Sequence, residues 1–332
     1  MARLEIVEFL KGYAIFTIII FHFLQALHLP GPYDQFIFFG GTGVHLFLLM
    51  SGFGLYLSYL KRPLPYGAYL KKRISKIYIP YILVVIISAT LSLFVPLYEN
   101  SWYALGGHVF LYKMFNESIM GSYGFPLWFI STILQLYIVF YGLAFIAKRL
   151  SNLQFLILCT VVSMIWIAIV ILIGKEPERV WNSFFLRYLW EFGLGMVIAS
   201  RIAQGDFQPG SRIKTIHYLI IGIFNCALYA FLALKGGGIG KMTNDIPALI
   251  GYSCIAIWVY RLNLDSINKF FIFTGKISFS LYLLHFMILY LLLFLLDALP
   301  VPAILIAALM VTYLVAVFYQ KVIDGLYKFM KI

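Results

Sequence analysis

Long apolar stretches constrain this chain more than any other feature of its sequence. A helix needs about 20 apolar residues to cross the hydrocarbon core of a bilayer. Ten stretches approach or exceed that length, near residues 8–28, 36–60, 77–97, 125–147, 153–174, 183–203, 215–235, 246–261, 272–296 and 302–322. Only 11% of the residues are charged, and no stretch is polar enough for a separate soluble domain. The sequence therefore predicts an all-α, polytopic membrane helix bundle of about ten transmembrane helices, forming one domain over residues 1–332 with no fused soluble domain.

The basic residues predict how this bundle is oriented. With ten crossings, both termini lie on one side, and 19 of the 25 Lys and Arg residues lie on that side. Five lie on the other side, and Arg187 lies within a span. Positive residues collect on the cytoplasmic side of membrane proteins, so both termini are predicted to be cytoplasmic. The net charge of +12 then follows from topology, and no nucleic-acid partner is expected.

Several motifs that would indicate other chemistry are missing from the sequence. The three cysteines (Cys159, Cys226 and Cys254) lie in apolar runs without paired spacing, so we expect neither disulfides nor a metal site. There is no phosphate-binding loop of the G-x-x-x-x-G-K-[ST] type and no dinucleotide fingerprint. Nucleotide hydrolysis and dinucleotide redox chemistry are therefore poorly supported.

Polar side chains recur at a similar depth in four of the predicted spans. His22, His45, Gln135 and His285 each lie roughly 14–20 Å along their helices at 1.5 Å per residue. Ionisable residues inside a membrane are costly, and they usually face a bundle interior where they have a function. An inward-facing polar pocket is the simplest arrangement. For His45 and His285 a structural hydrogen-bonding role is the simpler reading, whereas the isolation of His22 on its helix favours a functional one.

Two charged features each allow two interpretations. Arg187 and Glu191 are spaced i, i+4, so they can pair on one helix face. The pair then either neutralises itself, or Arg187 holds an anionic or carbonyl group. The 61–76 segment carries six positive charges and no acid. It either serves topology and contact with anionic lipid headgroups, or it binds the phosphates of a polyanionic cofactor.

Six segments together resemble the acyltransferase 3 family of bacterial integral membrane O-acyltransferases. Each is weak alone, but all six occur in the family's order over nearly the whole chain. They are the pair Lys11 and His22, "GGTGVHLFLLMSGF" (40–53), "LKKRISKIYIPYIL" (70–83) with Arg73 and Lys76, "PLWFISTILQLYIV" (126–139) with Trp128 and Gln135, "RYLWEFGLGMVIA" (187–199), and "GKISFSLYLLHF" (275–286) with Ser280, Tyr282 and His285. Lys11 stands where Arg is commoner, and His45 stands where many members carry an acid.

The resemblance implies an activity and a division of roles. His22 corresponds to the catalytic histidine, and Lys11, Arg73 and Lys76 correspond to contacts with a cytoplasmic acyl-CoA donor. The acceptor is a sugar hydroxyl of an extracytoplasmic or lipid-linked glycan, and the group moved is expected to be acetyl. The remaining residues of these segments are expected to bind substrate or support the site: His45, Trp128, Gln135, Arg187, Glu191, Ser280, Tyr282 and His285. The resemblance also implies a bacterial inner-membrane protein, and it leaves a homo-oligomer open.

The residues allow a mechanism that agrees with this resemblance. A neutral imidazole is a competent general base near neutral pH, and the length of helix from Lys11 to His22 is about that of a pantetheine arm. The cofactor phosphates would stay at the membrane surface while the thioester reaches His22. A covalent acyl-histidine intermediate stays open. The rival interpretation is a glycan-precursor exporter or proton-coupled transporter with a histidine proton relay, although no internal repeat supports it.

Overall fold

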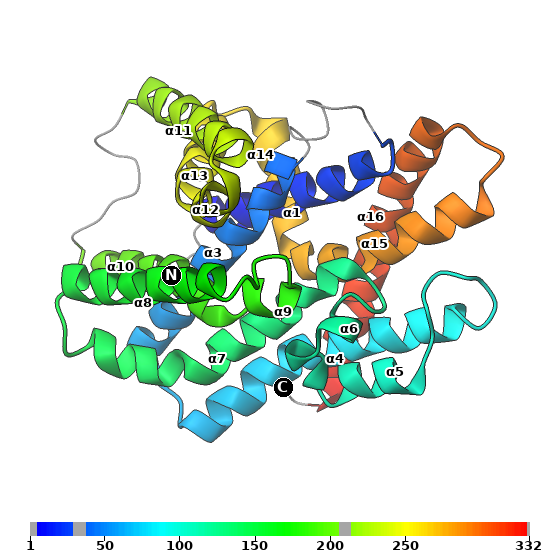
Figure 1. Ribbon diagram of the computed structural model, residues 1–332, viewed down its shortest axis with the longest axis horizontal. Helices are drawn as coiled ribbons and strands as arrows, with labels where there is room; N and C mark the ends of the chain where they lie inside the picture. Colours follow the sequence, from blue (N-terminus) through cyan, green and yellow to red (C-terminus); the bar gives the residue numbers. More distant parts are fainter. Residues whose placement is uncertain (1–4, 29–37, 206–213, 331–332) are drawn as a thin grey trace.

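The computed structural model describes residues 5–28, 38–205 and 214–330, and every regular element in these ranges is helical (Figure 1). Within these ranges, eight helices are long and apolar enough to cross a membrane. They are α1 (Glu5–Gln25), α3 (Gly43–Lys61, preceded by the 3₁₀ helix η1, Phe38–Thr42), α4 (Tyr66–Leu91), α7 (Trp128–Ala147), α8 (Asn152–Leu172), α11 (Thr215–Lys235), α15 (Ser278–Leu295) and α16 (Val301–Met330). The prediction of a polytopic, all-helical membrane bundle is therefore confirmed at this level.

In the described residues, fewer helices than the ten predicted are long enough to cross a membrane. Two of the predicted spans correspond to shorter helices, α10 (Leu189–Ala203, 15 residues) and α13 (Asp245–Arg261, 17 residues). The predicted ninth span is divided, because α14 (Asp265–Lys276) ends before α15 begins at Ser278. Residues 36 and 37 of the second predicted span lie outside the described ranges, as do Arg3, Arg212 and Lys331 of the charge count.

Short elements connect these helices. Most of them lie between α4 and α7, in a segment of about 35 residues that carries several one-turn helices. The short elements are α5 (Trp102–Val109), η2 (Tyr112–Phe115), α6 (Glu117–Met120), η3 (Phe125–Leu127), α9 (Arg179–Asn182), η4 (Phe185–Tyr188) and α12 (Gly237–Thr243).

The first helix, α1, packs against five other α-helices. In Figure 1, α1 runs through the middle of the molecule, and it contacts α3, α13, α14, α15 and α16. Its apolar side chains Ile15 and Ile19 are completely buried. Because α1 packs against these helices, part of it is removed from the surface, including the acid Glu8.

Glycines bring two helix pairs into backbone contact. A Cβ atom at Gly12 of α1 would lie 1.8 Å from the carbonyl oxygen of Phe271 in α14. A Cβ atom at Gly275 would lie 1.9 Å from the carbonyl oxygen of Glu8. Small residues allow this close approach in membrane helices. Gly52 of α3 and Gly195 of α10 make a similar reciprocal contact. These contacts fix α1 and α3, the two helices that carry His22 and His45.

Candidate active site

His22 and His285 face each other across the contact between α1 and α15. Their ring centroids are 5.3 Å apart, and the rings are tilted by 33°. His285 is completely buried, whereas His22 is half-buried. Phe286, next to His285, packs edge-on against the His22 ring with the centroids 5.5 Å apart. The structure therefore brings together two of the predicted site residues.

Hydrogen bonds orient both rings of this histidine pair. The Nδ1 atom of His285 lies 2.7 Å from the carbonyl oxygen of Tyr282, and the Nδ1 atom of His22 lies 3.1 Å from Oε1 of Gln25. These oxygens only accept hydrogen bonds, so each Nδ1 carries the proton and each Nε2 has a lone pair. Nε2 of His285 is buried and has no hydrogen-bond partner in the described part of the chain. Two basic nitrogens are thus available at one site.

Tyr282 ties this site to the start of α7. Its hydroxyl donates to the carbonyl oxygen of Pro126 at 2.5 Å. Tyr282 also stands one helical turn before His285, whose ring it approaches to 6.3 Å. Through this hydrogen bond the tyrosine joins α15 to the η3–α7 turn, and its role in the site stays a prediction.

His45 belongs to a second, separate polar group. Its Nδ1 atom lies 2.7 Å from Oε1 of Glu191, and its Nε2 atom lies 3.3 Å from Oδ1 of Asp245. Arg187 donates to Oδ2 of Asp245 through Nε at 3.1 Å and Nη2 at 2.8 Å, and its Nη1 donates to Oδ1 of Asn182. His45, Arg187, Glu191 and Asp245 thus bring two basic and two acidic side chains into contact. We call these four residues the ion quartet.

The ion quartet corrects the predicted pairing of Arg187 with Glu191. Arg187 lies in the 3₁₀ helix η4, and Glu191 lies in the first turn of α10. The i, i+4 rule assumes one continuous α-helix, and the change of helix type turns the two side chains toward different partners. The partner that the sequence analysis missed is Asp245, the first residue of α13. Its position directly before an apolar run was the available signal.

The ion quartet also contains a set of metal-ligand atoms. One imidazole and two carboxylates, from His45, Glu191 and Asp245, place possible ligand atoms within 4.8 Å of one another. Divalent cations use such ligands. However, the guanidinium of Arg187 already lies against the carboxylate of Asp245, and a second cation there would be repelled. The geometry therefore fits an internal ion network better than a metal centre.

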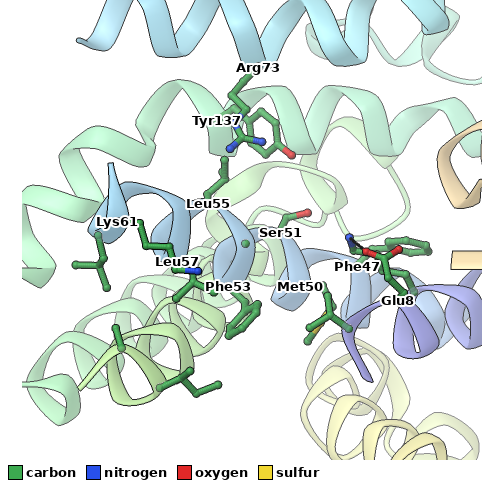
Figure 2. Close-up of a pocket in the computed structure, with 16 residues that line it drawn as sticks. Glu8, Phe47, Met50, Ser51, Phe53, Leu55, Leu57, Lys61, Arg73 and Tyr137 are labelled. Carbon is green, nitrogen blue, oxygen red and sulfur yellow. Dashed lines mark hydrogen bonds and ion pairs between the residues drawn. The ribbon is translucent and has the colours of Figure 1, made fainter. Parts of the chain in front are cut away.

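A cavity of about 760 Å³ opens at the Lys11 end of α1 (Figure 2). Basic residues from three helices line it: Lys11 of α1, Lys61 of α3 and Arg73 of α4. Ser51 and Tyr137 add hydroxyl groups to the lining, and Figure 2 shows Tyr137 next to Arg73. The cavity volume lies within the range of about 300–1,000 Å³ typical of small-molecule sites. It can therefore hold a sizeable anionic ligand.

Only two of the three residues predicted to contact the cofactor line this cavity. Lys11 and Arg73 line it, whereas Lys76, one turn beyond Arg73, is exposed and is not among the lining residues. Nζ of Lys11 lies 3.4 Å from Oε1 of Glu8, a buried acid that also lines the cavity. The sequence analysis missed Glu8, although its i, i+3 spacing from Lys11 was a signal.

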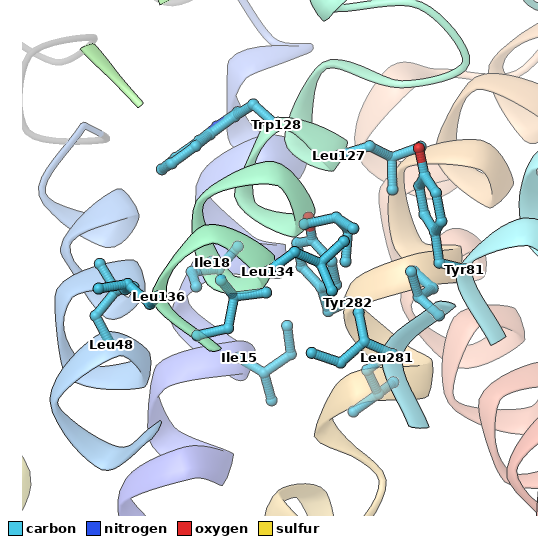
Figure 3. Packing of buried hydrophobic residues seen from close by; sticks show 14 of the residues in the cluster. Ile15, Ile18, Leu48, Tyr81, Leu127, Trp128, Leu134, Leu136, Leu281 and Tyr282 are labelled. Atoms are coloured by element: carbon cyan, nitrogen blue, oxygen red, sulfur yellow. The ribbon is translucent and has the colours of Figure 1, made fainter. Parts of the chain in front are cut away.

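An apolar layer separates this cavity from the histidine pair. Ile15 and Ile18 of α1 lie between Lys11 and His22 in the sequence, and they pack with Leu134 of α7 and Leu281 of α15 (Figure 3). All four side chains are at most 3% exposed. His22 and His285 are not among the residues that line the cavity. A ligand that reaches from one site to the other must therefore part this layer.

Three other predicted site residues have contacts that support the surrounding helices. Oε1 of Gln135 accepts from the backbone N–H of Phe185, which fixes the start of η4. The ring of Trp128 stacks on Tyr188 with the centroids 6.2 Å apart. The hydroxyl of Ser280 donates to Oε1 of Gln320 at 2.8 Å and so joins α15 to α16. The four polar positions that were predicted to share one pocket are therefore divided. His22 and His285 form the histidine pair, His45 belongs to the ion quartet, and Gln135 contacts the start of η4.

Comparison with known proteins gives one match. A family model described as an acyltransferase domain, that of the acyltransferase 3 family, matches residues 4–320 of the 332-residue chain. Searches of curated proteins and of solved structures find no significant match. The matched range includes the histidine pair, the ion quartet and the basic cavity. The chain therefore belongs to the acyltransferase 3 family of membrane acyltransferases.

Proposed function

We propose that this protein is a membrane O-acyltransferase that moves an acyl group, in the simplest case acetyl, from cytoplasmic acyl-CoA to a hydroxyl of an extracytoplasmic or lipid-linked glycan. The observation that carries this proposal is the arrangement of α1. One end of this helix places Lys11 in a basic cavity, and the other end presents His22 with a basic Nε2 atom. Membership of an acyltransferase family favours this function over an exporter or proton-coupled transporter.

The basic cavity is suited to the donor. Acyl-CoA carries several phosphate charges at one end and a thioester at the other. Arg73 offers a planar guanidinium, which binds phosphate through two parallel hydrogen bonds, and Lys11 and Lys61 add positive charge. The predicted orientation places this end of the bundle in the cytoplasm, where acyl-CoA is found.

The histidine pair is suited to proton transfer. The acceptor hydroxyl would give its proton to Nε2 of His22 as its oxygen attacks the thioester carbonyl. The thioester C–S bond then breaks, and the departing CoA thiolate takes the proton from the imidazolium. Such general-base catalysis contributes about 10²- to 10⁴-fold to a rate. In the alternative covalent route, the same Nε2 atom would first attack the thioester.

The distance between the two sites sets a requirement for the donor. Lys11 and His22 are about 16 Å apart along α1 at 1.5 Å per residue, and the apolar layer of Ile15, Ile18, Leu134 and Leu281 belongs to the buried core along this stretch. The pantetheine arm must therefore pass between these side chains. By excluding water from the path to His22, the apolar layer would limit hydrolysis of the donor thioester.

A purified-protein assay tests the proposal. The protein in lipid nanodiscs is given acetyl-CoA with and without a membrane-glycan extract, and free CoA thiol is measured together with the mass of the glycan. We expect thiol release that depends on the extract and a matching gain of one acetyl group per modified sugar. Uptake or efflux of the glycan in sealed vesicles, without thiol release, would instead assign the protein to transport.

A further inference from the structure

A second cavity lies beside the basic one and has a different character. It measures about 370 Å³ and lies between α11 and α13 on one side and α1, α3 and α10 on the other. Most of its lining is aliphatic, including Leu10, Leu46 and Ile257. Val7, Met50, Phe53 and Ile202 line both cavities, so these four apolar side chains form the partition between the two.

Polar groups of this second cavity gather at one end. Arg261, the last residue of α13, lines it together with Tyr218 and Tyr260. The guanidinium of Arg261 lies 5.3 Å from the centre of the Tyr218 ring. Deeper in the cavity, the hydroxyl of Ser253 is buried and has no hydrogen-bond partner within the described ranges. The cavity is thus mainly apolar, with a cationic and aromatic group at the Arg261 end of α13.

The depth of the cavity argues against the acyl part of the donor as its occupant. Ile6, Val7 and Leu10 line it from α1, and all three precede Lys11. The cavity therefore lies on the far side of Lys11 from His22. A donor whose phosphates bind Lys11 and whose thioester reaches His22 directs its acyl group away from this space.

The lining of the cavity suits a hydrocarbon chain. Eight of its fourteen described lining residues are Ile, Leu or Val, and Arg261 is the one charged residue among them. The neighbouring helix α11 is mostly exposed, with only 11% of its apolar stretch buried, so its outer face lies at the surface that a bilayer would cover.

We propose that this cavity binds one acyl chain of an anionic phospholipid, with the lipid phosphate at Arg261. The apolar lining holds the chain, while Arg261 and the two tyrosines hold the headgroup where amphipathic rings and cations meet the membrane surface. The bound lipid fills the gap between the α11–α13 pair and the rest of the bundle. It also packs against the partition, on the side opposite the basic cavity.

Lipid retention tests the proposal directly. The protein is purified in detergent, and bound phospholipid is measured by mass spectrometry after exchange into equal amounts of dioleoylphosphatidylglycerol and dioleoylphosphatidylcholine. We expect one retained lipid per protein and at least a fivefold preference for phosphatidylglycerol, about the effect of one cation near an anionic headgroup. Equal retention of the two lipids would overturn the anionic assignment.

Matched variants locate the bound lipid. Ile257→Trp fills the cavity, whereas Ile250→Trp places the same bulk on a 40% exposed position of the same helix. We expect only Ile257→Trp to lose the lipid, and Ser253→Leu, a smaller filling, to weaken its retention. Arg261→Gln should remove the preference for phosphatidylglycerol, and Arg149→Gln, another arginine that packs on an aromatic ring, should not. Full retention in Ile257→Trp would overturn the site.

A competition experiment separates this proposal from the acyl-transfer function. Palmitoyl-CoA should not displace the retained lipid if the cavity is reserved for phospholipid. Displacement of the lipid by palmitoyl-CoA, together with a loss of palmitoyl-CoA binding in Ile257→Trp, would reassign the cavity to the donor. The retention measurements need no enzymatic turnover, so their outcome is independent of the proposed function.

Discussion

Within the described residues, the Nε2 atom of His285 is buried without a hydrogen-bond partner beside the ring of His22, although the Nδ1 atom of the same imidazole is hydrogen-bonded to the backbone of its own helix. A buried acceptor without a donor is costly, and such groups in a native fold call for an explanation. In the proposed reaction, a hydroxyl of the acceptor would donate to one of the two Nε2 atoms, which would account for the buried nitrogen.

Replacing His22 tests the general base. His22→Ala should lower the rate of acyl transfer about 10²- to 10⁴-fold and leave the thermal stability close to that of the wild type, because His22 is only half-buried. The control is His217→Ala, which removes an exposed histidine of α11. The measurement is thiol release by purified protein with a glycan acceptor. Retention of more than half of the activity would rule out His22 as the base.

Charge-reversal variants distinguish basic residues that line the cavity from basic residues near it. Arg73→Glu should raise KM for acyl-CoA at least tenfold with little change in KM for the acceptor, because Arg73 lines the basic cavity. Lys76→Glu should have a smaller effect, since Lys76 is exposed and is not part of the lining. Lys71→Glu, on an exposed position of the same helix, is the control. Equal effects of all three would assign the basic segment to contact with lipid headgroups.

The ion quartet predicts which side chains are coupled. Arg187→Gln or Asp245→Asn alone should destabilise the detergent-solubilised protein by about 3–5 kcal/mol, because each leaves the ion quartet with one buried charge that is not compensated. The double variant should recover part of this loss. The same cycle with Arg187 and Glu191 should show weaker coupling, because Glu191 contacts His45. Thermal unfolding of the single and double variants gives the coupling energy, and strictly additive losses for Arg187 and Asp245 would contradict the contact.

The apolar layer predicts how the donor is protected from water. Ile18→Ala should open a path between the basic cavity and His22 and raise the hydrolysis of acetyl-CoA in the absence of acceptor. Its cost in stability should be about 2–5 kcal/mol, as for other buried Ile→Ala changes. Ile306→Ala, at a 64% exposed position, is the control. A ratio of hydrolysis to transfer equal to that of the wild type would mean that the layer does not act as this barrier.

Sequence patterns predicted the class of fold, since membrane spans are local features of the chain, whereas Lys11 was grouped with Arg73 only through the family resemblance. The pairing of His22 with His285 was expected only as part of a shared pocket, because sequence does not state which helices touch. The role of Asp245 escaped notice for the same reason. The i, i+4 pairing of Arg187 with Glu191 was wrong because a 3₁₀ helix occupies residues 185–188, and apolar periodicity does not distinguish it from an α-helix.

A buried lysine outside the membrane spans predicts how stability depends on pH. Lys113 of η2 is 1% exposed, and its Nζ atom donates to the carbonyl oxygen of Met120 at 3.3 Å. Burial lowers the pKa of Lys113 from 10.5 to about 7. The neighbouring His108, held by Tyr81 and Ser122, has a pKa lowered to about 2 by burial and by Lys113. His108 therefore stays neutral throughout the range in which Lys113 titrates.

The sign of the effect follows from the two states of Lys113. Above its folded pKa of about 7 the folded protein holds Lys113 neutral, whereas the unfolded chain stays protonated up to 10.5. The unfolded state then binds more protons, so stability rises with pH between about 7 and 10.5, by at most about 1.4 kcal/mol per pH unit. Lys113→Met should remove this slope and stabilise the protein most below pH 7, where burying the ammonium costs most. The exposed Lys214→Met is the control. Thermal unfolding curves of the wild type and Lys113→Met that run parallel over this pH range would show that Lys113 keeps its proton, and that its amine finds in solution a partner or water that offsets its burial.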